Sequence, residues 1–372
     1  MQWFIFSLLI VALAYLATKV SKIKKYRYLL LVALALVMAV VVGFGGIESK
    51  DHDGYVMLYN NLIHGKLSDF GFGLGRMDGS FEWGYTAVNY LAMYLGLGEA
   101  GFFTLVAFIT NFFILLVMFR ESKHFVFSCF LFILSFFYMQ EPNLVRQSLA
   151  AAFALFSLRY LDNNKIKLFL LFVFLSGLMH VSGFFFVLFL PLSRLNFEKH
   201  RTHVLLVLIS LWAISLLYLY GFLHSDFLEA ANIFRQMSLG EKLTGVSDSE
   251  FIRSILNDIM NLLLLLIFIY YLFVNQKAKL NVWVVLLVLG PVCYNMGENS
   301  YSLFRFACYF LPLMPILIPN FLYEFKLSKN DNTHFLYYIY VLWNISILIR
   351  SHIMSDAPLF FNEMYSLKDF FA

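Results

Sequence analysis

The chain has 372 residues, of which 61% are hydrophobic and only 13% are charged, against about 25% charged residues in an ordinary soluble domain. A soluble protein of this length would need far more polar surface, so the composition excludes a soluble enzyme, a disordered chain and a DNA-binding protein. The net charge of +4 is modest, and its distribution is more informative than its size. We therefore expect an all-α polytopic integral membrane protein.

Apolar runs of membrane-spanning length recur along the whole chain. A bilayer core about 30 Å thick requires roughly 17 to 25 apolar residues in a helix. In chain order the predicted spans are residues 2–18, 28–46, 100–119, 125–140, 146–161, 204–220, 255–274, 280–295, 304–323 and 335–350. Residues 85–98 form a weaker apolar stretch, which suits an interfacial or re-entrant helix. A single transmembrane domain over residues 1–372 follows.

The apolar run 168–193 is longer than one span and carries polar residues near its centre, among them His180 and Ser182. The loops on both sides of it are basic, so both ends are expected on the same side of the membrane. We therefore predict two short helices that meet in a tight turn near His180. With this pair, the chain is expected to make about twelve crossings.

Basic residues define the sidedness of these crossings. The first apolar run is followed, not preceded, by a basic cluster at residues 19–27, so it does not resemble a cleaved signal peptide. If residues 19–27 are cytoplasmic and the crossings alternate, the cytoplasmic loops hold 17 Lys+Arg and 5 Asp+Glu. The rest of the chain holds 10 Lys+Arg and 18 Asp+Glu. The positive-inside rule then predicts both termini on the outer side of the membrane. The long loops 47–84 and 221–254 face outward, where we expect the working surface.

Two arginines stand at the predicted outer ends of spans. An ionisable side chain at membrane depth costs about 2.5–3.5 kcal/mol or more, so it normally faces protein or a water-filled cavity. Arg146 follows Pro142 at the start of a span, and Gln147 continues its polar character. Arg305 and Tyr309 are four residues apart and would share one face of a helix. Both arginines suit bidentate phosphate binding, and the alternative is an interfacial anchor.

His180 and the carboxylates of the first outer loop are the candidate catalytic groups. An imidazole with an ordinary pKa near 6.5 can act as acid, base or hydrogen-bond donor. Either Asp53 or Glu82 is expected to serve as a general base. Aromatic and basic residues accompany the carboxylates, and they suit sugar binding or an ordinary interfacial aromatic belt. The candidate substrate-binding residues of this loop are Tyr55, Tyr59, Arg76 and Tyr85.

The predicted topology brings Arg146, His180 and Arg305 to the same side of the membrane. Two guanidiniums beside an imidazole and carboxylates suit a diphosphate leaving group, whose developing negative charge they would stabilise. Nucleotide sugars are cytoplasmic, so an outward-facing glycosyltransferase needs a lipid-linked sugar donor. The three cysteines lie in apolar runs without metal-ligand spacing. Neither a metal nor another cofactor is predicted, and no nucleic-acid partner is expected.

Five short segments together resemble one known family. They are residues 53–59, 81–85, 145–150, 180–182 and 305–309, and the Arg-Gln-Ser and His-x-Ser elements are the most specific of them. Over roughly residues 45 to 325 the chain resembles the EpsG group of Wzy-type bacterial polysaccharide polymerases. The resemblance implies a multi-helix architecture like that of GT-C glycosyltransferases, with an outward-facing cavity.

The same resemblance implies an activity and a set of partners. Oligosaccharide repeats linked to polyprenyl diphosphate, such as undecaprenyl diphosphate, would be joined outside the cytoplasmic membrane. The lipid-linked donor and acceptor would be the partners in the membrane, with a flippase and a chain-length regulator as further candidates. Arg146 and Arg305 would bind the donor diphosphate, His180 would assist the transfer, and Asp53 or Glu82 would activate the acceptor hydroxyl.

Other functions stay open at this point. An O-antigen-type ligase would use the same donors with a different acceptor, and a glycan acyltransferase would modify the same products. A lipid-linked oligosaccharide flippase or another transporter is a different class. It would be expected to show repeated halves and access from both faces, and neither is evident in the sequence.

Overall fold

A computed structural model describes residues 2–20, 24–45, 51–63, 72–73, 81–219, 281–297, 301–317, 319–320 and 366–371. The chain forms two compact units. The first consists of Met1–Arg194, Leu311–Asn330 and Asn344–Ala372, and the second of Leu195–Phe310 and Asp331–Trp343. That the whole chain forms one transmembrane domain stays a prediction. The predicted spans 255–274 and 335–350, the outer loop 221–254 and the candidate residue Arg76 lie outside the described residues.

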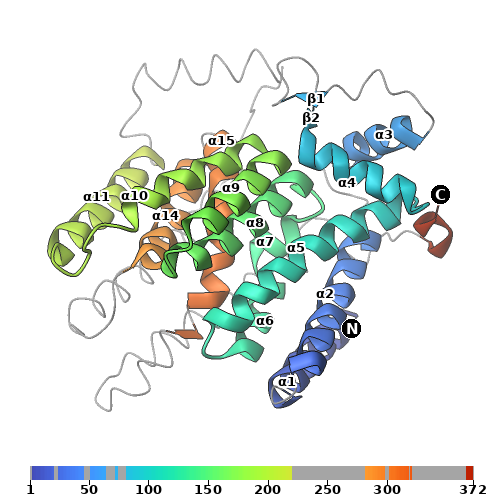
Figure 1. Ribbon diagram of the computed structural model, residues 1–372, viewed down its shortest axis with the longest axis horizontal. Helices are drawn as coiled ribbons and strands as arrows, with labels where there is room; N and C mark the ends of the chain where they lie inside the picture. The colour runs from blue at the N-terminus through green and yellow to red at the C-terminus, as the bar shows by residue number, and fades with distance from the viewer. Residues whose placement is uncertain are drawn as a thin grey trace, which may run out of the picture. The chain divides into compact units, whose positions relative to one another are not determined.

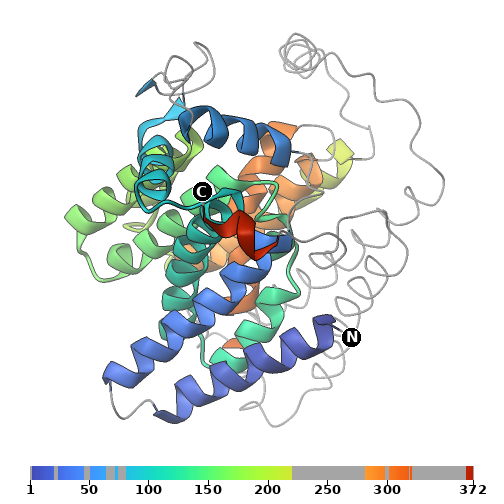
Figure 2. The ribbon, with the colours of Figure 1, turned by 90° about the vertical axis from the view of Figure 1, so that its right-hand side faces the viewer.

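The first unit is built around α2 (Lys24–Gly45) and α5 (Glu99–Glu121), which pack closely against each other. α1 (Gln2–Lys19) precedes α2 and packs alongside it as its antiparallel neighbour (Figure 2). These three helices confirm the helical prediction for the first two apolar runs and for 100–119. The backbone hydrogen bonds of each helix are made within that helix. The helices therefore pack through their apolar side chains, which are buried against one another.

The predicted span 125–140 is wrong as a single helix. The segment forms α6 (Phe125–Ile133) and the short α7 (Phe136–Gln140) instead. Ser135 lies between them in an extended conformation, and its hydroxyl accepts the backbone N–H of Tyr138 at 3.3 Å, which starts α7 as an N-cap. A serine inside an apolar run can thus end one helix and begin the next.

The following helix, α8 (Val145–Asp162), confirms the prediction for residues 146–161 within one residue at each end. It is buried along nearly its whole length between α5 and α9 (Ile166–Met179). Alanines at positions 150–152 and 154 allow these neighbours to approach closely. α8 therefore lies in the core of this unit (Figure 1).

The predicted turn near His180 is confirmed. α9 ends at Met179, His180 is extended, and the chain returns through the 3-10 helix η4 (Val181–Leu188) and α10 (Phe189–Leu192). The two arms touch at Gly183, where a Cβ atom would collide with the hydroxyl and backbone of Ser176. A glycine at this point is needed because the arms of the hairpin lie so close together.

The predicted outer loop 47–84 contains regular structure. α3 (His52–Ile63) occupies its first part, and the two-residue strands β1 (Phe72–Gly73) and β2 (Phe81–Glu82) pair in parallel. α3 has a buried face formed by His52, Tyr55, Tyr59 and Leu62. The weaker apolar stretch 85–98 is represented by α4 (Trp83–Tyr94), which begins directly after β2. Apart from this strand pair and one isolated β-bridge between Leu97 and Phe371, the described residues are helices and turns, as predicted for an all-α chain.

The C-terminal segment η6 (Leu367–Phe370) packs at the start of α5. The backbone carbonyl of Phe370 accepts a hydrogen bond from the N–H of Gly98 at 2.8 Å. The ring of Phe370 stacks on the ring of Phe44 at the end of α2. This is the end of both helices that the predicted topology places outside. The sidedness itself stays a prediction.

In the second unit, α14 (Val282–Gly297) packs against both α11 (Arg201–Leu219) and α15 (Tyr301–Phe310). The predicted span 304–323 is helical over Arg305–Leu317, but its α-helix is interrupted, because α15 ends at Phe310 and the 3-10 turn η5 (Leu311–Leu313) follows. Pro312 lies in this turn and cannot donate a backbone hydrogen bond, which accounts for the interruption.

The described helices are consistent with a membrane protein. Tyr26–Gly45 and Glu99–Glu121 are long and apolar enough to cross a bilayer, and shorter apolar helices accompany them. α9 exposes large apolar side chains at Leu168, Leu170, Leu171 and Phe174. Exposed apolar faces of this kind are expected where helices contact lipid or another protein.

Candidate functional site

A buried ion pair joins the start of α8 to the end of β2. Arg146 Nη1 lies 2.7 Å from Glu82 Oε2, and the two side chains are 6% and 3% exposed. Glu82 stands at the N-cap position of α4, yet its side chain makes no capping hydrogen bond there and turns to Arg146 instead. Desolvating two charges is costly, and removing one partner of such a pair typically costs about 3–5 kcal/mol.

Glu82 also connects this pair with the His180 turn. Its other oxygen, Oε1, accepts the backbone N–H of Val181 at 3.3 Å. The approach depends on Gly84, because a Cβ there would come within 2.7–2.9 Å of Met179 and Leu178 at the end of α9. Glu82 therefore orients Arg146 and holds the hairpin turn at the same time.

Two tyrosines complete the surroundings of Arg146. The guanidinium carbon lies 5.8 Å from the ring centroid of Tyr85, within the range of a cation–π interaction. The ring of Tyr55 meets Tyr85 edge-on at 6.1 Å, and its phenol oxygen also interacts with the guanidinium. α3, β2, α4 and α8 thus each supply one residue of the cluster, which consists of Tyr55, Glu82, Tyr85 and Arg146.

His180 adjoins this cluster through its neighbours Gln147 and Ser182. Its Nδ1 accepts the backbone N–H of Ser182 at 3.3 Å and lies 2.6 Å from the Ser182 hydroxyl. An Nδ1 that accepts hydrogen bonds leaves the proton of the neutral ring on Nε2. Nε2 lies 3.4 Å from the side-chain amide of Gln147.

The arrangement suits anion binding beside a proton-handling group. A guanidinium offers a planar fork of donors, and a low-dielectric setting strengthens its attraction for a phosphate. His180 is half-buried and therefore accessible, whereas Glu82 is buried with both oxygens engaged. Within the part of the chain that the structure describes, no group of three His, Cys, Asp or Glu side chains could hold a metal ion.

The remaining predicted residues of the first outer loop separate into two kinds. Asp53 is exposed on α3, on the side away from the buried face. Tyr59 is fully buried, donates its hydroxyl to the carbonyl of Leu97 at 2.6 Å and stacks on Phe102 at 4.6 Å between ring centroids. Burial raises the pKa of Tyr59 to about 12. These contacts give Tyr59 a packing role, and sugar binding by it stays a prediction.

Arg305 and Tyr309 belong to the second unit. Both lie on α15, so the prediction that they share a helix is confirmed. Arg305 is half-buried and Tyr309 is buried. Their convergence with Arg146 stays a prediction.

A second polar contact in the first unit was not among the predicted site residues. Asn111, in the middle of α5, donates its side-chain N–H to Glu141 Oε2 at 2.8 Å, and both residues are buried. An asparagine inside the apolar run 100–119, and a glutamate directly before Pro142, were the available signals. Neither signal indicates its partner 30 residues away.

Comparisons with known proteins agree with this description. Neither the curated proteins nor the solved structures include a match to the chain. The model of the EpsG family matches residues 28–362, which include every described element of the cluster. Because this match covers most of the sequence, the chain belongs to the EpsG family, and this membership implies a role in exopolysaccharide biosynthesis.

Proposed function

We propose that the protein is a membrane glycosyltransferase that polymerises oligosaccharide repeats linked to polyprenyl diphosphate, on the outer face of the cytoplasmic membrane. The observation that carries the proposal is the buried pair of Arg146 and Glu82 beside the His180 turn. A buried guanidinium held in place by a carboxylate is prepared to bind a diphosphate, and family membership points to exopolysaccharide synthesis.

The proposed reaction transfers the growing glycan from its lipid carrier. A hydroxyl oxygen of the acceptor repeat attacks the anomeric carbon of the donor, and the bond from this carbon to the diphosphate oxygen breaks. The polyprenyl diphosphate leaves with the electron pair, and the hydroxyl proton passes to a base. Arg146 stabilises the charge that develops on the leaving oxygen.

We propose different tasks for the candidate acids and bases. Both oxygens of Glu82 already accept hydrogen bonds, so we propose that it positions Arg146 and does not take the proton. His180 presents an Nε2–H and can donate a hydrogen bond to a phosphate oxygen. Asp53 is the exposed carboxylate of the pair predicted as base, and it is our candidate for activating the acceptor.

We propose that this chemistry lies in a recess below the outer membrane surface, because the hairpin arm is short. α9 has 14 residues, so at a rise of about 1.5 Å per residue it is roughly 21 Å long. A bilayer core is about 30 Å thick, so a hairpin that starts at the cytoplasmic boundary would end below the outer surface. A diphosphate headgroup could enter such a recess while its lipid tail stays in the membrane.

The test compares glycans in cells that lack the gene and carry plasmid-borne variants. Arg146→Ala should leave single lipid-linked repeats on the outer face, and the wild type should make long polymer. Arg159→Ala is the matched control. Arg159 lies at the opposite end of α8 from Arg146, and it pairs with Glu121 of α5 at 3.3 Å. This variant should support polymer formation.

Each alternative function predicts a different product. Normal polymer in an Arg146→Ala strain with normal protein levels would refute the proposed role of Arg146. Long polymer that stays on its lipid carrier in the deletion strain would indicate a ligase. Repeats that accumulate on the cytoplasmic face would indicate a flippase. Because Arg146→Ala also breaks a buried ion pair, Arg146→Lys should be compared as a variant that keeps the charge.

A further inference from the structure

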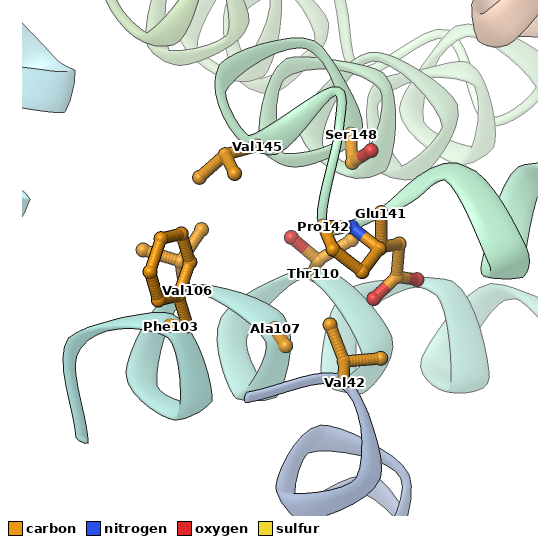
Figure 3. A pocket seen from close by; sticks show the side chains of 9 residues that line it. All are labelled: Val42, Phe103, Val106, Ala107, Thr110, Glu141, Pro142, Val145 and Ser148. Carbon is orange, nitrogen blue, oxygen red and sulfur yellow. The ribbon is translucent and has the colours of Figure 1, made fainter. Parts of the chain in front are cut away.

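A small pocket lies beside the first turn of α8, between this helix, α2, α5 and the turn that follows α7 (Figure 3). Its volume is about 10 Å³, close to the smallest space that holds one water-sized particle. Most of its lining is apolar, but Thr110, Glu141 and Ser148 each contribute a polar side chain.

The three polar side chains are almost completely buried, at 1% for Thr110, 3% for Glu141 and 2% for Ser148. Among the residues that the structure describes, Thr110 Oγ1, Glu141 Oε1 and Ser148 Oγ have no hydrogen-bond partner. Buried polar atoms are nearly always paired, so three such atoms around one pocket indicate an occupant.

Two other buried hydroxyls in the described residues, those of Thr104 and Ser157, behave differently. Thr104 donates to the carbonyl of Ala100 in its own helix, at 2.7 Å. Ser157 donates to Ala154 in the same way, at 2.6 Å. Thr110 and Ser148 also stand in helices, and within the described ranges neither makes such a bond. Their oxygens are therefore available to a ligand in the pocket.

The carboxyl group of Glu141 constrains the identity of this ligand. Oε2 accepts the N–H of Asn111, so the proton of a neutral acid would stand on Oε1, where the described residues offer it no acceptor. An ionised carboxylate would leave a buried negative charge, and no described cationic side chain forms a salt bridge with it. An unpaired buried charge is very costly.

We propose that this pocket binds one sodium ion through Glu141 Oε1 and the hydroxyl oxygens of Thr110 and Ser148. Hard cations prefer oxygen ligands, and one carboxylate balances one positive charge. A divalent ion would keep one unbalanced positive charge beside the single carboxylate, and sites for such ions usually contain more carboxylates. The ligands come from α5, from the turn after α7 and from α8, so the ion ties these three segments together.

The ion would also influence the candidate site. Ser148 lies in the same first turn of α8 as Arg146, and Val145 of this turn lines the pocket. Fixing this turn from the pocket side would hold Arg146 against Glu82. Sodium binding does not depend on the proposed glycosyltransferase activity and can be tested without it.

The experiment uses the full-length protein purified in detergent. Thermal unfolding is followed as NaCl replaces choline chloride at constant ionic strength, because a ligand that binds the folded state raises the Tm with its concentration. We expect the Tm to rise with Na⁺ and the bound ²²Na⁺ to approach one ion per chain. Glu141→Gln should abolish both effects, and Ser148→Ala should shift the Tm response to higher Na⁺ concentration.

Glu121→Gln is the control, since Glu121 is half-buried at the opposite end of α5 and pairs with Arg159. It should keep the sodium response. A wild-type Tm that is the same in Na⁺ and choline, without ²²Na⁺ binding, would overturn the proposal and indicate a water molecule beside a neutral acid. An unchanged response in Ser148→Ala and Thr110→Val would also overturn it, even if Glu141→Gln did not fold.

Discussion

Arg146 and Glu82 are 64 residues apart in the sequence, and their side chains form an ion pair of 2.7 Å inside the protein. The pair brings the start of the buried helix α8 to the end of β2, and Glu82 extends the link to Val181. This relationship unites two residues that the sequence singled out for different reasons. It also makes the stability of the fold and the geometry of the site depend on the same contact.

The ion pair should show strong energetic coupling. Arg146→Ala or Glu82→Ala alone leaves one buried charge without its partner, so each should lower the free energy of unfolding by about 3–5 kcal/mol. The double variant removes both charges and should lose less than the sum of the single effects. Thermal or denaturant unfolding of the four purified proteins measures the coupling, and additive losses would contradict the pairing.

His180 and Ser182 should affect activity more than stability. His180→Ala removes the Nε2–H that we assign to the diphosphate and should reduce polymer formation by about 10²-fold or more, as is typical for proton-handling groups. Ser182→Ala removes the hydroxyl 2.6 Å from Nδ1 and should cause a smaller loss. The measurement is polymer yield at equal protein level.

Ser193→Ala provides the control for these two variants. Ser193 lies at the end of the same hairpin, and its hydroxyl donates to the carbonyl of Leu190. It should leave polymer yield unchanged. Equal losses for Ser182→Ala and Ser193→Ala would show that the effect comes from the hairpin fold and not from the imidazole.

The packing of α3 should weaken at acidic pH. Burial against Phe103 lowers the pKa of His52, and the nearby carboxylates of Asp53 and Glu99 oppose this shift without cancelling it. The unfolded chain therefore binds a proton on His52 at a higher pH, near its ordinary pKa of about 6.5, than the folded chain does. Stability from this site is present above that pH and is lost as the pH falls below it.

A comparison of the wild type with His52→Phe tests this pH dependence. The phenyl ring keeps an aromatic contact with Phe103 and cannot bind a proton. Between pH 7.5 and 5.5 (values chosen to bracket an ordinary histidine pKa of about 6.5), the Tm of the wild type should decrease more than that of the variant. Parallel decreases would contradict the assignment.

The closed hairpin at His180 should not tolerate a larger residue at position 183. A Cβ on Gly183 would collide with Ser176 of the opposite arm, so Gly183→Ala should destabilise the protein by about 1–3 kcal/mol, the usual cost of overpacking. Gly54→Ala is the control, because a Cβ on Gly54 meets no atom within 4 Å. Equal unfolding temperatures of the two variants would argue against the close contact.

Local patterns in the sequence predicted part of this structure well. α8 and the turn at His180 were predictable, because an apolar run bounded by polar residues and a run too long for one span are both visible without knowledge of partners. The break between α6 and α7 was not, since it depends on one capping hydroxyl at Ser135 inside an apolar run. α3 was missed because its buried face includes His52 and two tyrosines, which look polar in a loop.

The candidate site was predictable as residues but not as contacts. Arg146, Glu82 and His180 stand out individually because charged or polar groups are costly in an apolar chain. Their mutual arrangement depends on long-range packing, such as the approach of Gly84 to the end of α9. For the same reason the contact between Asn111 and Glu141 could not be derived from either residue alone.

Binding of the lipid carrier tests the central claim most directly. Purified wild type, Arg146→Ala and Arg159→Ala should be titrated with undecaprenyl diphosphate in detergent, with undecaprenol as the ligand that lacks phosphate. Arg146 is proposed to bind the diphosphate. Arg146→Ala should therefore no longer bind undecaprenyl diphosphate more tightly than undecaprenol, whereas Arg159→Ala should still do so. If Arg146→Ala discriminates between the two lipids as well as the wild type does, Arg146 does not bind the diphosphate and the account is wrong.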